Sequence, residues 1–239
     1  MIFKFKKLLS ILKESLYIKA LQKGVAAGVE HKNILMNLEE CRHIVDIGAN
    51  RGQFALVSRN CFPNARIDSF EPLLEPADIY REVFTGDNNV ELHPYAIGDE
   101  TGEVAIHVSN HDDSSSLLPI AEMQTELFPG TEEIETRTIN VTPLEEILSE
   151  EKIITPALLK LDVQGFELLA LKGCSTLLHK FHNVYVECSF VELYAGQSFA
   201  DEVISFLSGQ KFRLVGVYNM CYDKRGKAIQ ADFLFELNE

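Results

Sequence analysis

Apolar residues beyond position 41 fall into short runs that alternate with stretches of helical periodicity. The short runs predict buried strands, and the periodic stretches predict helices between them. We expect strands over residues 43–47, 66–70, 90–93, 158–163, 184–187, 212–217 and 232–236, and helices over residues 54–59, 75–84, 166–178 and 199–207. This alternation predicts an α/β fold in which helices cover both faces of a mostly parallel sheet.

Two parts of the chain depart from this alternation. Only a turn-rich loop at 223–226 joins the last two predicted strands, so we expect them to pair antiparallel. Residues 103–109 predict an added strand that pairs with 136–141. Residues 110–135 are polar and poorly periodic, which predicts a long loop or lid. Loops of this length in a compact domain are usually functional or disordered.

The first 40 residues predict a helical extension ahead of a domain over residues 41–239. Residues 2–23 have apolar side chains near helical spacing and hold six lysines against one acid, Glu14. Such an amphipathic helix suits an acidic membrane surface. It equally suits a helix that packs across the domain with its lysines in water, which we favour. Residues 24–28 predict its end and a joint.

Net charge, the length of apolar runs and the spacing of the cysteines argue against several classes of protein. The net charge of −14 argues against a nucleic-acid partner, because phosphate binding needs a basic surface. No run reaches the roughly 18 apolar residues of a membrane-spanning helix, and no secretory pattern opens the chain. The five cysteines lack metal-type spacing and predict reduced thiols in a cytoplasmic protein.

A glycine-containing motif follows the first predicted strand directly. It reads Asp46-Ile47-Gly48-Ala49-Asn50-Arg51-Gly52-Gln53-Phe54. The two glycines permit a tight turn and a close approach to a ligand, and the helix behind them offers its N-terminus to a polar group. The three-glycine pattern of dinucleotide loops is absent. An acid two residues before the first glycine suits a cationic ligand better than a pyrophosphate.

A second motif, Ser69-Phe70-Glu71-Pro72, closes the second predicted strand. Glu71 lies 19 residues beyond Gly52, where an acid can accept hydrogen bonds from both hydroxyls of a ribose. Pro72 stops the strand and fixes the acid at its tip. Together the two motifs predict a nucleoside cofactor, without choosing between S-adenosylmethionine and NAD.

Carboxylates at two later strand ends are the candidate catalytic groups. Asp162 lies near the carboxyl end of the predicted strand 158–163, and Glu187 ends the strand 184–187. Ligands of open α/β sheets bind in crevices at these ends. Asp162 could orient an acceptor hydroxyl or take its proton. The two carboxylates would also suit Mg²⁺, although we assign no residue as a metal ligand. His111, beside two aspartates in the predicted lid, is a further candidate base.

Taken in order, these motifs resemble the FkbM-type methyltransferases, a branch of the class I S-adenosylmethionine-dependent enzymes. The resemblance spans about residues 43–217, and the matching segments are 45–54, 70–72, 96–99, 114–116, 160–167 and 171–173. It implies a Rossmann-like, doubly wound sheet of seven strands with the last strand antiparallel. It also favours S-adenosylmethionine over NAD.

The resemblance implies a cofactor site in three parts. Its residues are Asp46, Gly48, Asn50 and Gly52 at the methionine end, with Phe54 in the same motif, then Glu71 with Pro72 at the ribose, and Tyr95, Ala96 and Ile97 beside the adenine. Members of the family O-methylate sugars, glycolipid or oligosaccharide hydroxyls and polyketide-type products, which implies that the acceptor is a hydroxyl of a sugar, a glycan or a related natural product. The alternatives are an NAD-linked oxidoreductase and a non-catalytic cofactor-binding protein.

Overall fold

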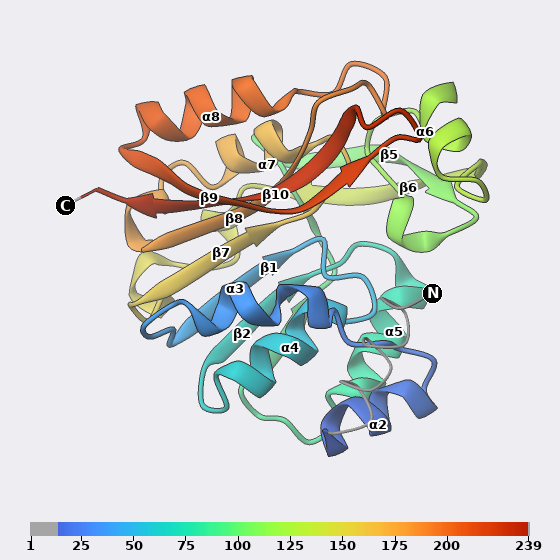
Figure 1. Cartoon of the computed structure of the whole chain (residues 1–239). Coiled ribbons are helices and arrows are strands. Elements are labelled where there is room, and N and C mark those ends of the chain that lie inside the picture. The colour runs from blue at the N-terminus through green and yellow to red at the C-terminus, as the bar shows by residue number, and fades with distance from the viewer. Residues whose placement is uncertain (1–13, 239) are drawn as a thin grey trace.

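The computed structural model describes residues 14–238 and contains two sheets (Figure 1). The larger sheet has seven strands in the order β3-β2-β1-β7-β8-β10-β9. Its strands are β1 (His43–Ile47), β2 (Arg66–Phe70), β3 (Val90–His93), β7 (Ala157–Leu161), β8 (Asn183–Ser189), β9 (Phe212–Tyr222) and β10 (Ala228–Leu237). β1 pairs in parallel with β2 and β7, whereas β10 pairs antiparallel with β8 and β9. The Rossmann-like sheet with an antiparallel last strand is therefore confirmed.

Helices cover both faces of this sheet (Figure 1). One face carries α7 (Glu167–Gly173) and α8 (Ala200–Gly209), and the other carries α2 (Ser15–Gln22), α3 (Lys32–Met36), α4 (Gln53–Cys61) and α5 (Leu74–Val83). Successive side chains of a strand point to opposite faces. In β1, Val45 and Ile47 accordingly join the apolar cluster under α7 and α8, while Ile44 joins the cluster under α4.

The smaller sheet contains β4 (Ala96–Ile97), β5 (Gly102–Ser109) and β6 (Glu133–Thr142). The antiparallel pairing of β5 with β6 confirms the added strands predicted at 103–109 and 136–141. The segment between them was predicted to lack regular structure, and this was wrong in part. It contains α6 (Glu122–Leu127) and a 3-10 turn, η2 (Asp112–Ser114), which are too short to produce a detectable period.

The helix predicted over 166–178 is also shorter than expected. α7 ends at Gly173, and the chain continues through turns to the 3-10 helix η5 (Leu178–Lys180). At Gly173 a Cβ would lie 2.1 Å from the carbonyl oxygen of Gly98, so the end of α7 lies directly against another backbone segment. Two more 3-10 helices, η3 (Leu144–Glu146) and η4 (Glu150–Lys152), precede β7.

The described part of the N-terminal extension packs on the domain. Tyr17 and Ala20 of α2 are buried in the same apolar cluster as α4, and a 3-10 helix, η1 (Val29–His31), leads into α3. Residues 2–13 of the predicted amphipathic helix lie outside the described residues. Within residues 14–238, no helix combines the length and the apolar character that crossing a bilayer requires.

A buried carboxylate ties together the three strands on one side of the larger sheet. Asp68 on β2 is fully buried and accepts hydrogen bonds from His43 Nε2 at 2.7 Å, from His93 Nε2 at 2.8 Å and from the Arg66 guanidinium. Burial alone would raise the pKa of the Asp68 carboxyl. The three donors outweigh burial and hold this pKa well below its usual range.

We predict that Asp68→Asn lowers the free energy of unfolding by about 3–5 kcal/mol at pH 7, because it leaves buried donors without their charged partner. The stabilisation is fully present above the ordinary pKa of an aspartate and is lost as the pH falls toward the lowered value, so the difference between wild type and variant begins to shrink only below about pH 4. Denaturant unfolding measures both effects. Glu91→Gln removes an Arg66 partner whose side chain is 59% exposed, and serves as the control with a loss below about 1 kcal/mol. Equal stability of wild type and Asp68→Asn at pH 7 would contradict the prediction.

Candidate functional site

The loop between β1 and α4 turns sharply at Gly48, beside the end of β7. Gly48 has a φ of +77°, and a Cβ at this position would lie 1.9 Å from the carbonyl oxygen of Asp162. Only glycine fits there, because any side chain would collide with the neighbouring backbone. This contact places Asp162 next to the β1 loop, at the carboxyl ends of two adjacent parallel strands.

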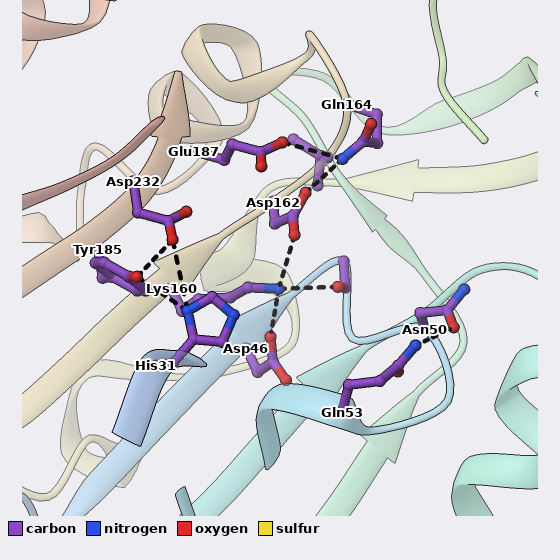
Figure 2. Close-up of polar contacts among 12 residues, drawn as sticks. His31, Asp46, Asn50, Gln53, Lys160, Asp162, Gln164, Tyr185, Glu187 and Asp232 are labelled. Atoms are coloured by element: carbon purple, nitrogen blue, oxygen red, sulfur yellow. Dashed lines mark hydrogen bonds and ion pairs between the residues drawn. The ribbon is translucent and has the colours of Figure 1, made fainter. Parts of the chain in front are cut away.

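A buried ion pair joins the same two strands (Figure 2). Lys160 Nζ lies 3.0 Å from Asp46 Oδ1, donates to the Gly48 carbonyl oxygen at 3.0 Å and lies 4.0 Å from Asp162 Oδ2. Asp46 and Lys160 face each other in the register of β1 and β7. Burial alone would lower the pKa of Lys160, but the charges of Asp46 and Asp162 raise it, so the ammonium stays charged.

Asp46 was predicted to line the methionine end of a cofactor, but the structure places it elsewhere. Its side chain is fully buried beneath the loop and pairs with Lys160. The sequence-based prediction missed Lys160. The sequence does indicate a buried ion pair here, because Lys160 lies inside the otherwise apolar run 157–161 and a buried charge requires a partner.

A central cleft lies at the carboxyl ends of β1, β2 and β7. Its polar lining includes Gly48, Asn50, Glu71 and Asp162. Its apolar walls are formed mainly by Phe70, Pro72, Tyr95, Ala96, Ile97, Ile106, Leu117 and Phe166. The structure thus brings together seven of the ten predicted cofactor residues: Gly48, Asn50, Glu71, Pro72, Tyr95, Ala96 and Ile97.

The other two predicted residues of the first motif do not face this cleft. Gly52 has a φ of +93° and packs against α5, where a Cβ would lie 2.7 Å from Phe84 Cε2. Phe54 is buried, and its ring stacks on Tyr185 with centroids 6.0 Å apart. Gly52 therefore permits the close packing of the motif on α5, and Phe54 lines the N-terminal hollow, a neighbouring space that is described below.

Glu71 stands in the central cleft as a buried carboxylate. It accepts hydrogen bonds from the backbone N–H of Asn50 at 2.9 Å and from that of Leu73 at 2.8 Å. Burial raises the pKa of Glu71 to about 7, although these hydrogen bonds oppose the shift. A carboxylate can accept about four hydrogen bonds, so Glu71 keeps acceptor capacity for a ligand.

Two further spaces adjoin the central cleft. The N-terminal hollow lies between residues 24–31 and the β1 loop with the start of α4. The lid hollow lies between residues 111–131 and the side chains of Gln164 and Gln230. Asp113 and Asp162 line all three spaces, so the three spaces meet at these two carboxylates.

A hydrogen-bond network orients the carboxylate of Asp162 (Figure 2). Gln164, with a φ of +54°, donates through Nε2 to Asp162 Oδ1 at 2.7 Å and to Glu187 Oε2 at 3.2 Å. Tyr194 donates to Gln164 Oε1 at 2.7 Å, and Gln230 donates to Glu187 Oε1 at 2.8 Å. Glu187 therefore orients Gln164 and is not among the residues that line the three spaces. Burial and nearby carboxylates raise its pKa well above the usual value.

His111, the third candidate, lines the lid hollow together with Asp162. Gln124 and Phe128, which the sequence-based prediction did not single out, line the same hollow. Gln124 is 3% exposed, and its Oε1 has no hydrogen-bond partner among the described residues. Their signal was weak, because both lie in the segment that was expected to be an irregular lid.

A magnesium site at Asp162 and Glu187 is not supported. Within the described part of the chain, the single cluster of three or more side chains able to hold a metal is Asp68, Glu91 and His93, and there the Arg66 guanidinium already binds the carboxylates. The amide of Gln164, which donates to Asp162 and to Glu187, holds a position between them that a cation would need.

Comparisons with known proteins agree with this geometry. Residues 46–214 match the model of the methyltransferase FkbM domain. The 2-O-methyltransferase NoeI of Sinorhizobium fredii (strain NBRC 101917 / NGR234) is 30% identical over 193 residues, which cover 76% of this chain and 77% of that protein.

Solved structures share the fold at low sequence identity. A proposed O-methyltransferase from Klebsiella pneumoniae superposes with a TM-score of 0.51 at 12% identity, covering 94% of this chain and 88% of the other. A proposed rRNA methylase from Clostridium thermocellum superposes with a TM-score of 0.50 at 13% identity, covering 89% and 96%. With the family match over most of the sequence, the chain belongs to the FkbM methyltransferase family and is an S-adenosylmethionine-dependent methyltransferase.

Proposed function

We propose that this enzyme transfers the methyl group of S-adenosylmethionine to a hydroxyl of a sugar or glycan. One observation carries the proposal: the central cleft, the N-terminal hollow and the lid hollow meet at Asp162. A reaction between a cofactor and an acceptor needs such a meeting point, with a group there that can handle the acceptor proton. The 2-O-methyltransferase named above supports an oxygen acceptor.

The central cleft fits the adenosine part of the cofactor. Its apolar walls, including Tyr95, Ile97 and Phe166, suit an adenine ring. Glu71 lies between these walls and the Gly48 loop with acceptor capacity left for the two ribose hydroxyls. We therefore assign adenine recognition to the walls and ribose recognition to Glu71.

The lid hollow fits an acceptor rich in hydroxyl groups. Gln124, Gln164, Gln230 and His111 offer amide and imidazole groups, and Gln124 Oε1 is a buried acceptor without a partner among the described residues. Phe128 adds an apolar ring, which suits the C–H face of a sugar. A sugar presents both kinds of surface, and this combination favours it as the acceptor class.

The chain contributes position and proton handling to the reaction. The bound cofactor supplies a methyl group that is already activated by the sulfonium charge. Asp162 receives the hydrogen bond of the acceptor hydroxyl and takes its proton as the new C–O bond forms and the methyl–sulfur bond breaks, which releases S-adenosylhomocysteine. Gln164 and Glu187 keep the Asp162 carboxylate aimed at the meeting point, so much of the rate comes from orientation.

Calorimetric titration separates this proposal from the alternatives. The enzyme should bind S-adenosylhomocysteine and not NAD, and it should methylate at least one member of a panel of nucleotide sugars and oligosaccharides. Binding of NAD alone would favour an oxidoreductase. Cofactor binding without transfer to any acceptor of the panel would favour a non-catalytic protein.

We predict that the affinity for S-adenosylhomocysteine depends on the ionisation of Glu71. Ribose hydroxyls donate to the carboxylate, and with a pKa of about 7 the ionised fraction falls as the pH is lowered. The dissociation constant measured by calorimetry should therefore rise about tenfold from pH 8 to pH 6. Glu71→Gln should bind more weakly and without this dependence. Glu75→Gln, an exposed change on α5, should behave like wild type, whereas a pH-independent wild type would refute the role of Glu71.

A second prediction concerns Asp162. Asp162→Asn should lower turnover by about 10²–10⁴-fold, because the amide cannot take the acceptor proton. Its affinity for S-adenosylhomocysteine should stay within about twofold of wild type. Asp113→Asn changes the other carboxylate at the meeting point and should reduce turnover far less. The reverse order of the two variants would assign the base to the lid, and lost cofactor affinity in Asp162→Asn would place Asp162 in the cofactor site.

A third prediction concerns acceptor binding. Gln124→Leu should raise the KM for the acceptor by about 2- to 10-fold, which corresponds to one lost hydrogen bond, while kcat stays unchanged. Gln210→Leu, an exposed change after α8, is the matched control and should leave both constants unchanged. An unchanged KM in a folded Gln124→Leu enzyme would show that the acceptor does not reach Gln124.

A further inference from the structure

The lid hollow is lined by two carboxylates, Asp113 and Asp162, and among the described residues that line it none is a lysine or an arginine. We propose that this hollow binds an ammonium group of the acceptor through Asp113 and Gln124, and that the methylated sugar is therefore an amino sugar. The inference rests on the proposed function, because it assumes that the acceptor lies in the lid hollow.

Gln124 supplies an observation that does not depend on charge. Its side chain lines the lid hollow from α6 and is 3% exposed. Within residues 14–238, its Oε1 has no hydrogen-bond partner. A buried acceptor without a partner is unfavourable, and a ligand that donates a hydrogen bond removes this cost. The group expected beside Gln124 is therefore a donor, which a phosphate or a carboxylate is not.

The other two amides of the hollow already use donor hydrogens on carboxylates. Gln164 Nε2 donates to Asp162 at 2.7 Å and to Glu187 at 3.2 Å. Gln230 Nε2 donates to the other oxygen of Glu187 at 2.8 Å. These donors are therefore directed at carboxylates of the protein and not at a ligand.

The hydroxyl groups of the hollow are engaged as well. Thr131 Oγ1 donates to the Phe128 carbonyl oxygen at 2.7 Å, and Ser114 Oγ donates to Asp113 Oδ1 at 3.5 Å. The hollow thus offers a ligand more acceptors than donors. An ammonium carries three donor hydrogens and no acceptor, so it matches this lining.

The nearby cations of the site do not compensate the carboxylates of the lid hollow. Lys160 is paired with Asp46, and the guanidinium of Arg51 lies 2.6 Å from Asp112. Neither cation is among the residues that line the lid hollow. An acceptor phosphate in this hollow would therefore meet carboxylates without a countercharge.

The carboxylates also repel one another. Burial raises the pKa of Asp113, and the charges of Asp112 and Asp162 raise it further. A cation bound beside Asp113 would relieve this repulsion, whereas an anion would add to it. The cofactor sulfonium is the rival cation, because Asp113 also lines the central cleft.

The test measures methyl transfer at pH 7 to matched acceptors that differ in charge. Methyl glycosides of glucose, galactose and mannose are supplied as parents, as derivatives with one hydroxyl replaced by an amine, as the N-acetylated forms of these derivatives and as phosphates. Placing the amine at each ring position in turn ensures that the reacting hydroxyl is retained in most derivatives. The best amino glycoside should exceed its N-acetylated form in kcat/KM by about tenfold or more, as expected for a hydrogen bond to a charged group. The phosphates should be the poorest acceptors.

Asp113→Asn tests where the ammonium binds. It should raise the KM for the amino glycoside about tenfold and lower kcat less than about threefold, because the lost contact binds the acceptor and does not take its proton. The KM for any neutral glycoside that is methylated should stay within about twofold. Asp201→Asn, a matched exposed change at the start of α8, should alter none of these constants.

Four outcomes distinguish the possibilities. A loss in Asp113→Asn that is confined to amino glycosides supports the inference. Equal or better transfer to N-acetylated or phosphorylated forms overturns it and leaves the proposed function intact, as does an equal loss for every acceptor. Weaker binding of S-adenosylmethionine but not of S-adenosylhomocysteine in Asp113→Asn would assign this carboxylate to the sulfonium and also overturns it. If wild type binds the cofactor but methylates no sugar of the panel, the proposed function is wrong and the inference falls with it.

Discussion

The contact between the tips of β1 and β7 is the constraint on which the rest of the site depends. Lys160 reaches from β7 to Asp46 and to the Gly48 carbonyl oxygen, and Gly48 lies so close to Asp162 that no side chain fits between them. A buried ion pair gains little stability over an apolar pair, but losing one partner costs about 3–5 kcal/mol. The Lys160–Asp46 pair therefore fixes how the two strand ends meet, and the cleft opens at that meeting point.

The lid segment is tied to the same place. Ser116 donates through Oγ to the Gln164 carbonyl oxygen at 2.6 Å, and the Tyr194 hydroxyl lies 3.1 Å from the Ser114 carbonyl oxygen. The strained backbone of Gln164 thus connects the lid segment with Asp162. A left-handed conformation of a non-glycine residue is uncommon, and at functional sites it is retained where the surroundings fix it.

Local pattern in the sequence was sufficient for the sheet and for most of the cleft. Short apolar runs and their turn residues located the seven strands, because burial on both faces requires them. Glu71 could be found because a proline ends its strand. Asp46 shows the limit of this reasoning. An acid at a strand end can face a ligand or a buried cation, and only the register with Lys160 decides between them.

Other features depend on contacts between distant segments, which a single sequence does not display. Residues 24–28 were interpreted as the end of a helix and a joint, yet most of them line the N-terminal hollow, where Gly28 N–H donates to the Gln53 carbonyl oxygen. Glu187 was predicted to be catalytic because it ends a strand, but its carboxylate is hydrogen-bonded to the side chain of Gln164, which also binds Asp162.

A crystal structure of the complex with S-adenosylhomocysteine tests the central claim most directly. We predict both ribose hydroxyls at about 2.6–3.2 Å from the Glu71 carboxylate, with the sulfur facing Asp162. A ligand bound outside the central cleft, with Glu71 making no contact to the ribose, would contradict it.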